Sequence, residues 1–561
     1  MSKLLKIIGR IAGISAEWIL ILFIFFAFAI RTYPVQTFIA KKVASHLSSE
    51  LDAEIKLEAL EIIFFDRALL KNVHVKDRQN KTLLVMEEMD LRLNSNIFFE
   101  KPFRVDKIKL SRGEVNIYRD ELNGILNFQF LVDYFKQTPD PTAEPIDFGV
   151  NFIELEEVDF NYDDYRKPEL KFGFDHNHID LNNVQLAIHD FKMEKDEYHF
   201  DVKSISCQDQ SGIELTDFES KVSIKEGQIA LNSLHIQTAF SSVFAEQFAF
   251  RFNQWKDFGH FSEQIKFDVK IDSSKVSLQD VSYFVPDLKG MNNQIALKGV
   301  FTDVLEDLKI KDLDLRFGAS SFLKGDFLLP SFTDTSEQYL KQHLSKVYVD
   351  LADLYAIQMP QGMPQIDLDP QLKKNEFLSI SNMEIMGSED NFDFKFDTVK
   401  TALGELFLPT SMNFNRKNEK IKIQSNERGI NDLFVRELHL DELLNENKLG
   451  KIRGSIKPEV EISKGEVSLK LHPSELSMMV NDYNISKIKI EEGTFKNNQL
   501  KTSLTISDDN VILDLACDID LGKNQTIDGI LNIDFLNLDA LNLTSDSCSI
   551  ESSSIAMNLI H

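Results

Sequence analysis

The sequence has few cysteines and few basic residues, and each shortage excludes a class of protein. Cys207, Cys517 and Cys548 lie far apart, which excludes a CxxC zinc or redox motif and a disulfide-rich scaffold. At most one disulfide could form. There are 62 Lys and Arg against 89 Asp and Glu, a formal net charge of −27. No basic block follows the first ten residues, so nucleic-acid binding is excluded.

Glycine and proline are also scarce, with 23 and 14 in 561 residues. These are about 4 % and 2.5 %, against typical values of about 7 % and 5 %, so the turn-rich composition of a β-sandwich is missing. The sequence contains no H-E-x-x-H, G-x-S-x-G or P-loop motif. We therefore predict that the protein is not an enzyme and carries no cofactor.

Weaker polar groupings also favour solvated surfaces over binding sites. His176 and His178 would share one strand face, but spacing places no third metal ligand beside them. The pair Asp163-Asp164 lacks the glycine and the closing glutamate of a calcium loop, and so do Asp518 and Asp520. We predict no metal site.

Apolar residues are abundant, with 44 Phe, and one long apolar run lies at the N-terminus. Lys3, Lys6 and Arg10 precede residues 11–30, which as a helix are long enough to cross a hydrocarbon core of about 30 Å. The flanking charges predict an inner-membrane anchor with a cytoplasmic N-terminus and an exported remainder. The anchor residues are Trp18, Ile19, Leu20, Phe23, Phe25, Phe26 and Ile30. The alternative is a cleaved signal peptide, because Ala27-Phe28-Ala29 fits a cleavage site.

Helical spacing of apolar residues recurs in three further segments. Residues 32–50 carry a stripe at spacings of three and four, which predicts an amphipathic helix. Its members are Val35, Phe38, Ile39, Val43 and Leu47. A short helix is predicted at 126–135, and a longer one at 337–357.

Most of the remaining chain alternates apolar and polar residues, which predicts strands with one apolar and one wet face. Such strands are more often antiparallel than parallel. The clearest apolar sets, which we predict to line a lipid-binding groove, are Ile265, Phe267, Val269 and Ile271; Phe392, Phe394 and Phe396; and Val511, Leu513 and Leu515.

Many one-faced strands must hide their apolar side, either in a sandwich or barrel or in a sheet that folds around itself. Few helices are available to cover a sheet. We therefore predict a mainly β fold, in which one transmembrane helix precedes a long, curved, mostly antiparallel sheet that forms an open hydrophobic groove. The predicted organisation is an anchor at 1–31, a helix at 32–50, a β-groove at 51–330, a helical insertion at 331–360 and a continuing groove at 361–561.

Several segments resemble one known family. They are Tyr33-Pro-Val-Gln-Thr-Phe-Ile-Ala-Lys-Lys-Val-Ala-Ser-His-Leu47, Leu60-Glu-Ile-Ile-Phe-Phe-Asp66, Leu70-Lys-Asn-Val-His-Val-Lys-Asp77, Val115-Asn-Ile-Tyr-Arg119, Leu126-Asn-Phe-Gln-Phe130 and the stretch from Ser274 to Gly290. With the basic start and single membrane segment, they resemble the N-terminal part of the TamB family, the inner-membrane component of the translocation and assembly module. The resemblance is to its Bacteroidota form, within the wider AsmA-like group, and is clearest over residues 1 to about 300.

The resemblance implies a hydrophobic groove that crosses the periplasm and moves phospholipid toward the outer membrane. An alternative role is a scaffold for outer-membrane protein assembly through β-strand pairing. The implied partners are phospholipid, the inner membrane and a BamA-like or TamA-like barrel, and a monomer is expected. Family members are longer, so the chain is expected to be incomplete at its C-terminus.

Overall fold

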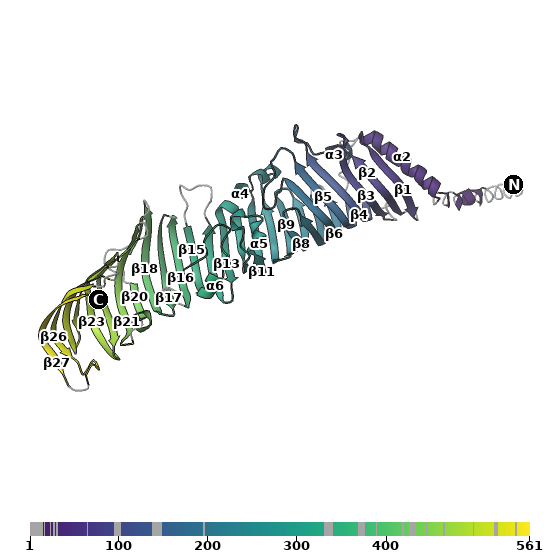
Figure 1. The fold of residues 1–561 in the computed structure, drawn as a ribbon. Coiled ribbons are helices and arrows are strands. Elements are labelled where there is room, and N and C mark those ends of the chain that lie inside the picture. Colours follow the sequence, from purple (N-terminus) through teal and green to yellow (C-terminus); the bar gives the residue numbers. More distant parts are fainter. Residues whose placement is uncertain are drawn as a thin grey trace. The chain divides into compact units, whose positions relative to one another are not determined.

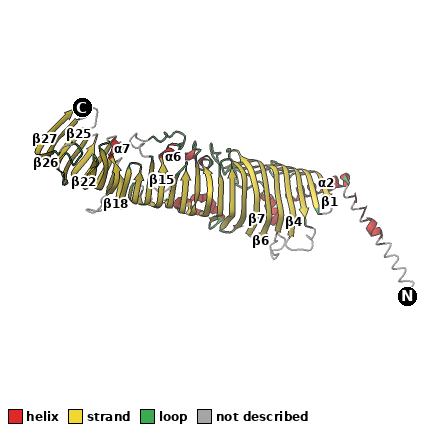
Figure 2. Cartoon of the chain, turned by 90° about the horizontal axis from the view of Figure 1, so that it is seen from below, coloured by secondary structure: helices red, strands yellow, loops and turns green. Residues whose placement is uncertain are grey.

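The computed structural model shows a mainly β protein (Figures 1 and 2). It describes residues 15–560 except 16, 23, 26–27, 30–31, 64–65, 95–102, 137–147, 195–196, 330–339, 368–375, 389, 418–419, 426–432, 445–446, 464–465, 498, 521–525 and 545–546. The described strands, β1 to β27, are assigned to one sheet. The chain divides into unit 1, Met1–Asp257 with Ile271–Gly290, and unit 2, Phe258–Lys270 with Met291–His561.

Unit 1 contains most of the longer helical structure. Its elements are α2 (Tyr33–Leu51), β1 (Ile55–Ile63), β2 (Arg67–Lys76), β3 (Thr82–Leu93), β4 (Phe103–Arg119), α3 (Gln129–Lys136), β5 (Phe148–Asp164), β6 (His178–Glu194), β7 (Glu197–Asp209), β8 (Glu214–Lys225), β9 (Gln228–Thr238), β10 (Ser242–Arg251), η1 (Trp255–His260), which runs on into unit 2, α5 (Leu278–Ser282) and η2 (Pro286–Leu288). Strand β11 (Lys266–Ser277) contributes residues to both units.

Unit 2 is built almost entirely of strands. Its elements are α4 (Phe261–Gln264), β12 (Gln294–Val304), η3 (Leu305–Asp307), β13 (Leu308–Phe317), β14 (Ser321–Leu329), β15 (Leu340–Asp350), α6 (Leu351–Tyr355), β16 (Phe377–Ser388), β17 (Asn391–Thr401), β18 (Gly404–Lys417), β19 (Lys420–Ser425), β20 (Leu433–His439), α7 (Leu440–Leu444), β21 (Leu449–Ser463), β22 (Glu466–Val480), β23 (Tyr483–Lys496), β24 (Gln499–Ser507), β25 (Val511–Asp520), β26 (Thr526–Asn537) and β27 (Ser549–Ile560).

Sequence neighbours pair antiparallel through most of the sheet, which confirms the predicted strand direction. One described pair differs, because β4 and β5 run parallel. Parallel neighbours need a long crossover, and residues 120–147, which include α3, supply it. In unit 2, β19 and β20 both pair with β18 and with β21, so the two short strands together fill one position in the sheet.

A line of residues with positive φ crosses the first strands. Asn72 in β2, Arg112 in β4 and Glu157 in β5 have φ values of 50°, 53° and 54°. The register brings Asn72 and Arg112 to either side of Glu87 in β3, and Arg112 beside Glu157, without a shift between the paired strands at these positions. The side-chain alternation of these strands therefore reverses at one level of unit 1.

Helix α2 confirms the helix predicted at 32–50, but the predicted stripe packs only in part: Ile39 and Leu47 contact the buried clusters, whereas Phe38 and Val43 are exposed. Phe38 is 63 % exposed, whereas Ala40 is fully buried and Ala44 is 6 % exposed. The two alanines pack against β1 and β2 in a cluster of Ala40, Ala44, Leu57, Leu60 and Val73. Small side chains are favoured at this position because they let the helix backbone approach the sheet closely.

The helix predicted at 337–357 is wrong for residues 340–350, which form β15; among residues 340–357, which the structure describes, Leu351–Tyr355 are helical, as α6. The register shifts between Lys324/Lys346 and Gly325/Leu344, so Ser345 is an extra residue. This bulge puts Leu344 and Val347, which are 6 % and 7 % exposed, on one face. A bulged strand thus produces the i, i+3 spacing of a helix.

The predicted anchor lies partly outside the described residues, which exclude Phe23, Phe26 and Ile30. Trp18, Ile19, Leu20 and Phe25 are helical, and their side chains are 58–68 % exposed. Within the part of the chain that is described, no helix meets the length and hydropathy needed to span a membrane. The anchor stays a prediction.

Candidate functional site

The register of unit 2 joins apolar side chains of many strands into continuous rows on one face of the sheet. The longest row runs through Phe392, Phe414, Ile423, Val460, Leu469, Phe495, Leu500, Ile519 and Ile527. Every member is partly exposed. The rings of Phe392 and Phe414 stack, with centroids 4.5 Å apart. Side chains in a closed sandwich core would be buried, so this row lines an accessible apolar surface.

Two further rows lie on the same face. One contains Ile490, Leu504, Leu515 and Leu531, which are all partly exposed. The other contains Leu476, Ile488, Ile506, Leu513 and Ile533. Most members of that last row are buried, and Leu541 packs on it from the connection after β26. We call the partly exposed apolar face formed by such rows the lining.

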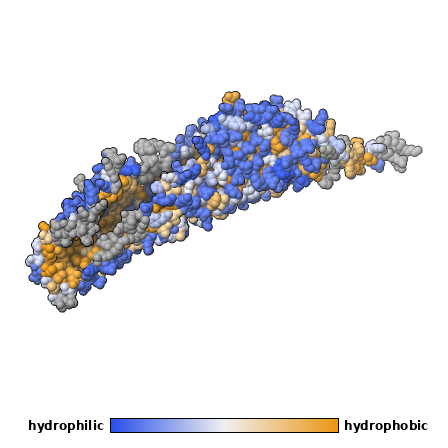
Figure 3. Space-filling view, viewed as in Figure 1, coloured by the Kyte–Doolittle hydropathy of each residue, from blue (hydrophilic) through white to orange (hydrophobic). Residues whose placement is uncertain are grey.

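A space-filling view shows the lining in unit 2 directly. At the end of the chain where β21 to β27 lie, the surface is hollowed and the visible wall is hydrophobic (Figure 3). An apolar surface of this kind marks a ligand, membrane or protein contact.

The opposite face of the same strands is charged and internally paired. Lys422 binds Glu459 at 2.6 Å, and Lys501 binds Asp518 at 2.7 Å, each across neighbouring strands. Alternation therefore separates a wet face from an apolar one, as the sequence predicts.

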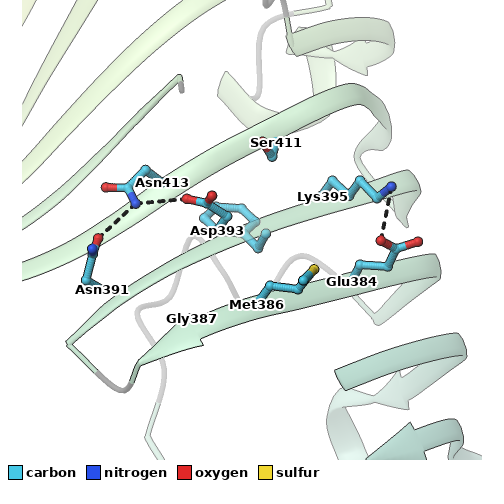
Figure 4. Close-up of a pocket in the computed structure, with 9 residues that line it drawn as sticks. Glu384, Met386, Gly387, Asn391, Asp393, Lys395, Ser411 and Asn413 are labelled. Atoms are coloured by element: carbon cyan, nitrogen blue, oxygen red, sulfur yellow. Dashed lines mark hydrogen bonds and ion pairs between the residues drawn. The ribbon is translucent and has the colours of Figure 1, made fainter. Parts of the chain in front are cut away.

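A shallow pocket on the wet face is lined by polar side chains that pair with one another (Figure 4). Asn413 donates to both Asn391 and Asp393 at 2.9 Å, and Lys395 lies 3.0 Å from Glu384. Among the described residues, no three His, Cys, Asp or Glu side chains are grouped to hold a metal ion. The pocket has the character of a paired polar surface.

Unit 1 carries the same kind of rows. One runs through Leu60, Leu70, Met89, Leu110, Leu155, Leu186 and Ile205. A neighbouring row runs through Ile62, Ala68, Leu91, Ile108, Ile153, Ile188 and Val202. Helix α2 covers these rows where they begin, at β1 and β2, and most later members are partly exposed.

Comparison with known proteins assigns the chain to a family. The model of the AsmA family matches residues 1–345, more than half of the chain. The chain belongs to the AsmA family. No curated protein and no solved structure matches it. The AsmA family is associated with outer-membrane assembly and lipid transport.

The residues predicted to line a groove fall into two groups in this AsmA family chain. Phe392, Phe394, Phe396, Leu513 and Leu515 are partly exposed, as are Phe267 and Ile271. Ile265, Val269 and Val511 are 0 %, 3 % and 2 % exposed, so the structure places them in closed packing. The predicted lining set contains no residue of β2 to β6, although apolar rows cross these strands. The alternation of β2, β4 and β5 reverses at Asn72, Arg112 and Glu157.

Two buried aspartates of the AsmA family chain stabilise turns by accepting hydrogen bonds. Burial opposes ionisation of Asp353, but three successive backbone N–H groups of residues 319–321, 2.7–2.9 Å away, outweigh burial and lower its pKa to about 2. Asp508 has a pKa of about 2 for the same reasons, since it accepts from the Tyr483 hydroxyl and from the Ser486 amide and hydroxyl.

The histidine pair is also structural. The ring of His178 lies between Asp163, at 3.1 Å, and the Lys167 carbonyl oxygen, at 3.0 Å. Burial opposes protonation, but these two acceptors outweigh it and raise the pKa of His178. His176 is exposed, and its ring lies 3.2 Å from the side-chain amide of Asn177. All three cysteines are free.

Proposed function

We propose that this chain belongs to the TamB branch of the AsmA family and carries phospholipid along its lining. Residues 11–30 anchor it in the inner membrane, and the sheet lies in the periplasm. Phospholipids move along it toward the outer membrane, where a BamA-like barrel is the partner. The observation that carries this proposal is the row from Phe392 to Ile527, which crosses the strands without a polar interruption while its members stay partly exposed.

The physical chemistry of the lining suits a carrier. Each methylene that leaves water contributes about 0.8 kcal/mol, so an acyl chain binds firmly wherever it contacts the rows. Because the rows repeat similar side chains, moving an acyl chain from one strand to the next changes its free energy little. A headgroup can stay hydrated at the open side. This function needs movement and no bond-breaking chemistry.

Photo-crosslinking in cells tests the proposal on the full chain. A photoreactive amino acid replaces Phe394, which belongs to the lining, and in a matched variant replaces Asp393, its exposed neighbour on the wet face. We expect phospholipid adducts at position 394 and none at 393. Equal labelling at the two positions would contradict the proposal. Adducts with protein instead of lipid at 394 would favour the scaffold for outer-membrane protein assembly.

A further inference from the structure

The lining of unit 1 is covered at its first strands by a second helix besides α2. A row through Ile55, Val75, Leu84, Val115, Phe160 and Leu181 crosses β1 to β6. Helix α3 packs where this row begins, in a cluster of Leu51, Ala53, Leu83 and Phe130 against which Ile55 and Val75 also pack. The later members Val115, Phe160 and Leu181 are partly exposed. Helix α3 is also in contact with α2 (Figure 1).

A single aromatic side chain makes the central contact of α3 with this surface. Phe130 is 5 % exposed, whereas Tyr134 on the same helix is 37 % exposed. The Arg78 guanidinium lies 5.4 Å from the centroid of the Phe130 ring. It also donates to the carbonyl oxygen of Leu51 at 3.4 Å. The cluster thus combines an apolar pocket with an exposed cation at its edge.

The attachment of α3 is local and short. It has eight residues, and helices of that length are not stable alone in water. The segment before it is pinned by Asn127, whose side chain accepts from the Tyr118 amide at 3.1 Å and donates to the Asn116 carbonyl oxygen at 3.0 Å. The helix can therefore leave the sheet while the preceding segment stays in place.

We propose that the surface beneath α3, formed by Ile55, Val75 and Leu83, is a binding site for a phospholipid acyl chain, which α3 occupies when no lipid is present. This inference rests on the proposed function. An acyl chain and the Phe130 ring bury the same apolar surface, so one replaces the other with little change in exposed area. Arg78, released from the ring, then faces the lipid phosphate, an anion suited to a guanidinium.

Photo-crosslinking at two positions of the full chain tests the site. The photoreactive residue is placed at Val75, beneath α3, or at Phe394, in unit 2. Each is combined with Phe130→Ala or with Leu122→Ala, a control in the same connection at a side chain that is 95 % exposed. We expect lipid adducts at Val75 to rise at least threefold in Phe130→Ala and to stay unchanged in Leu122→Ala. Adducts at Phe394 should be present in every variant.

A reversible cross-link between α2 and α3 gives a second test that does not depend on the folding of Phe130→Ala. Leu47→Cys in α2 and Leu131→Cys in α3 pack against the same cluster, and a short reducible thiol cross-linker joins them after the native cysteines are changed to serine. We expect the tether to abolish lipid adducts at Val75 and reduction to restore them. Equal adducts at Val75 with α3 tethered and released would overturn the site. Loss of adducts at Phe394 in all variants would instead contradict the proposed function.

Discussion

At the scale of single residues, close backbone approach and buried carboxylates fix the sheet. Gly113 in β4 lies opposite Met86 in β3 and Val158 in β5. A Cβ atom on Gly113 would lie 2.0 Å from the Val85 carbonyl oxygen and 2.7 Å from the Met86 sulfur. Met86 is fully buried. The glycine thus leaves room for the neighbouring strand at the level where the alternation of side chains reverses.

Gly113→Ala should destabilise the protein by about 1–3 kcal/mol, because the added methyl group overpacks a backbone contact. The free energy of unfolding in urea, followed by circular dichroism, measures the effect. Gly259→Ala is the matched control, since nothing lies within 4 Å of its Cβ position. We expect the control to change stability by less than about 0.5 kcal/mol. Equal stabilities of the two variants would contradict the close approach.

Asp353 predicts a pH dependence of stability. Its pKa falls from 3.8 to about 2 on folding, so folding favours the carboxylate. The stabilisation is fully present above pH 4 and is lost as pH falls through about 2; it is on the order of 2 kcal/mol. Asp353→Asn should flatten the fall in unfolding free energy between pH 5 and pH 2.5. Asp287→Asn, at an exposed position, is the control and should keep the wild-type dependence of the unfolding free energy on pH. An unchanged pH dependence in Asp353→Asn would refute the role given to Asp353.

At the scale of elements, α2 shows that small residues can decide which face of a helix packs against a sheet. Ala40 and Ala44 lie one turn apart and contact the first two strands, while Phe38 stays exposed. The spacing of apolar residues predicts that the larger side chains are buried. In the structure the two alanines are buried against the sheet, because their small side chains allow the closest approach between helix and strand.

Ala40→Leu should loosen α2 from β1 at a cost of about 1–3 kcal/mol, since Ala40 has no exposed surface to receive three more carbon atoms. Hydrogen exchange of the amides of residues 33–51 measures the loss, and we expect faster exchange there. Ser45→Leu, on the exposed side of the same helix, is the control and should leave exchange unchanged. Unaltered exchange in Ala40→Leu would show that the helix is held by other contacts.

The strands of unit 1 show why local pattern underestimates the lining. Leu110 and Gly113 lie in neighbouring rows although they are three positions apart, and so do Leu155 and Val158. One extra residue in each interval, with positive φ at Arg112 and at Glu157, reverses the alternation. Period two therefore fails at these two positions.

At the scale of the whole molecule, the proposed transport depends on an uninterrupted lining. Leu515 lies on the lining between Leu504 and Leu531, and Ala516 beside it is exposed on the wet face. These neighbours allow the same charge to be placed on either face of one strand.

Leu515→Arg should block phospholipid transfer without unfolding the chain, because the guanidinium puts a charge where acyl chains must pass. Ala516→Arg adds the same charge on the wet face and should transfer lipid at the wild-type rate. Transfer of labelled phospholipid between inner-membrane and outer-membrane fractions measures both, with unfolding midpoints as a check on folding. Normal transfer in Leu515→Arg would refute the carrier role.

The sequence by itself determined the mainly β fold, the mostly antiparallel pairing, the helix at 32–50 and the alternation that puts Phe392, Phe394 and Phe396 on one face. These features follow from local periodicity, which a strand or a helix imposes on its own residues. Only the tertiary structure decided which apolar residues are covered and which stay accessible. Val511 is buried and Leu515 is partly exposed although both share one pattern, because Val511 belongs to the buried cluster that contains Leu541 and Leu515 lies outside that cluster. Such coverage depends on segments distant in sequence, so no local pattern contains it.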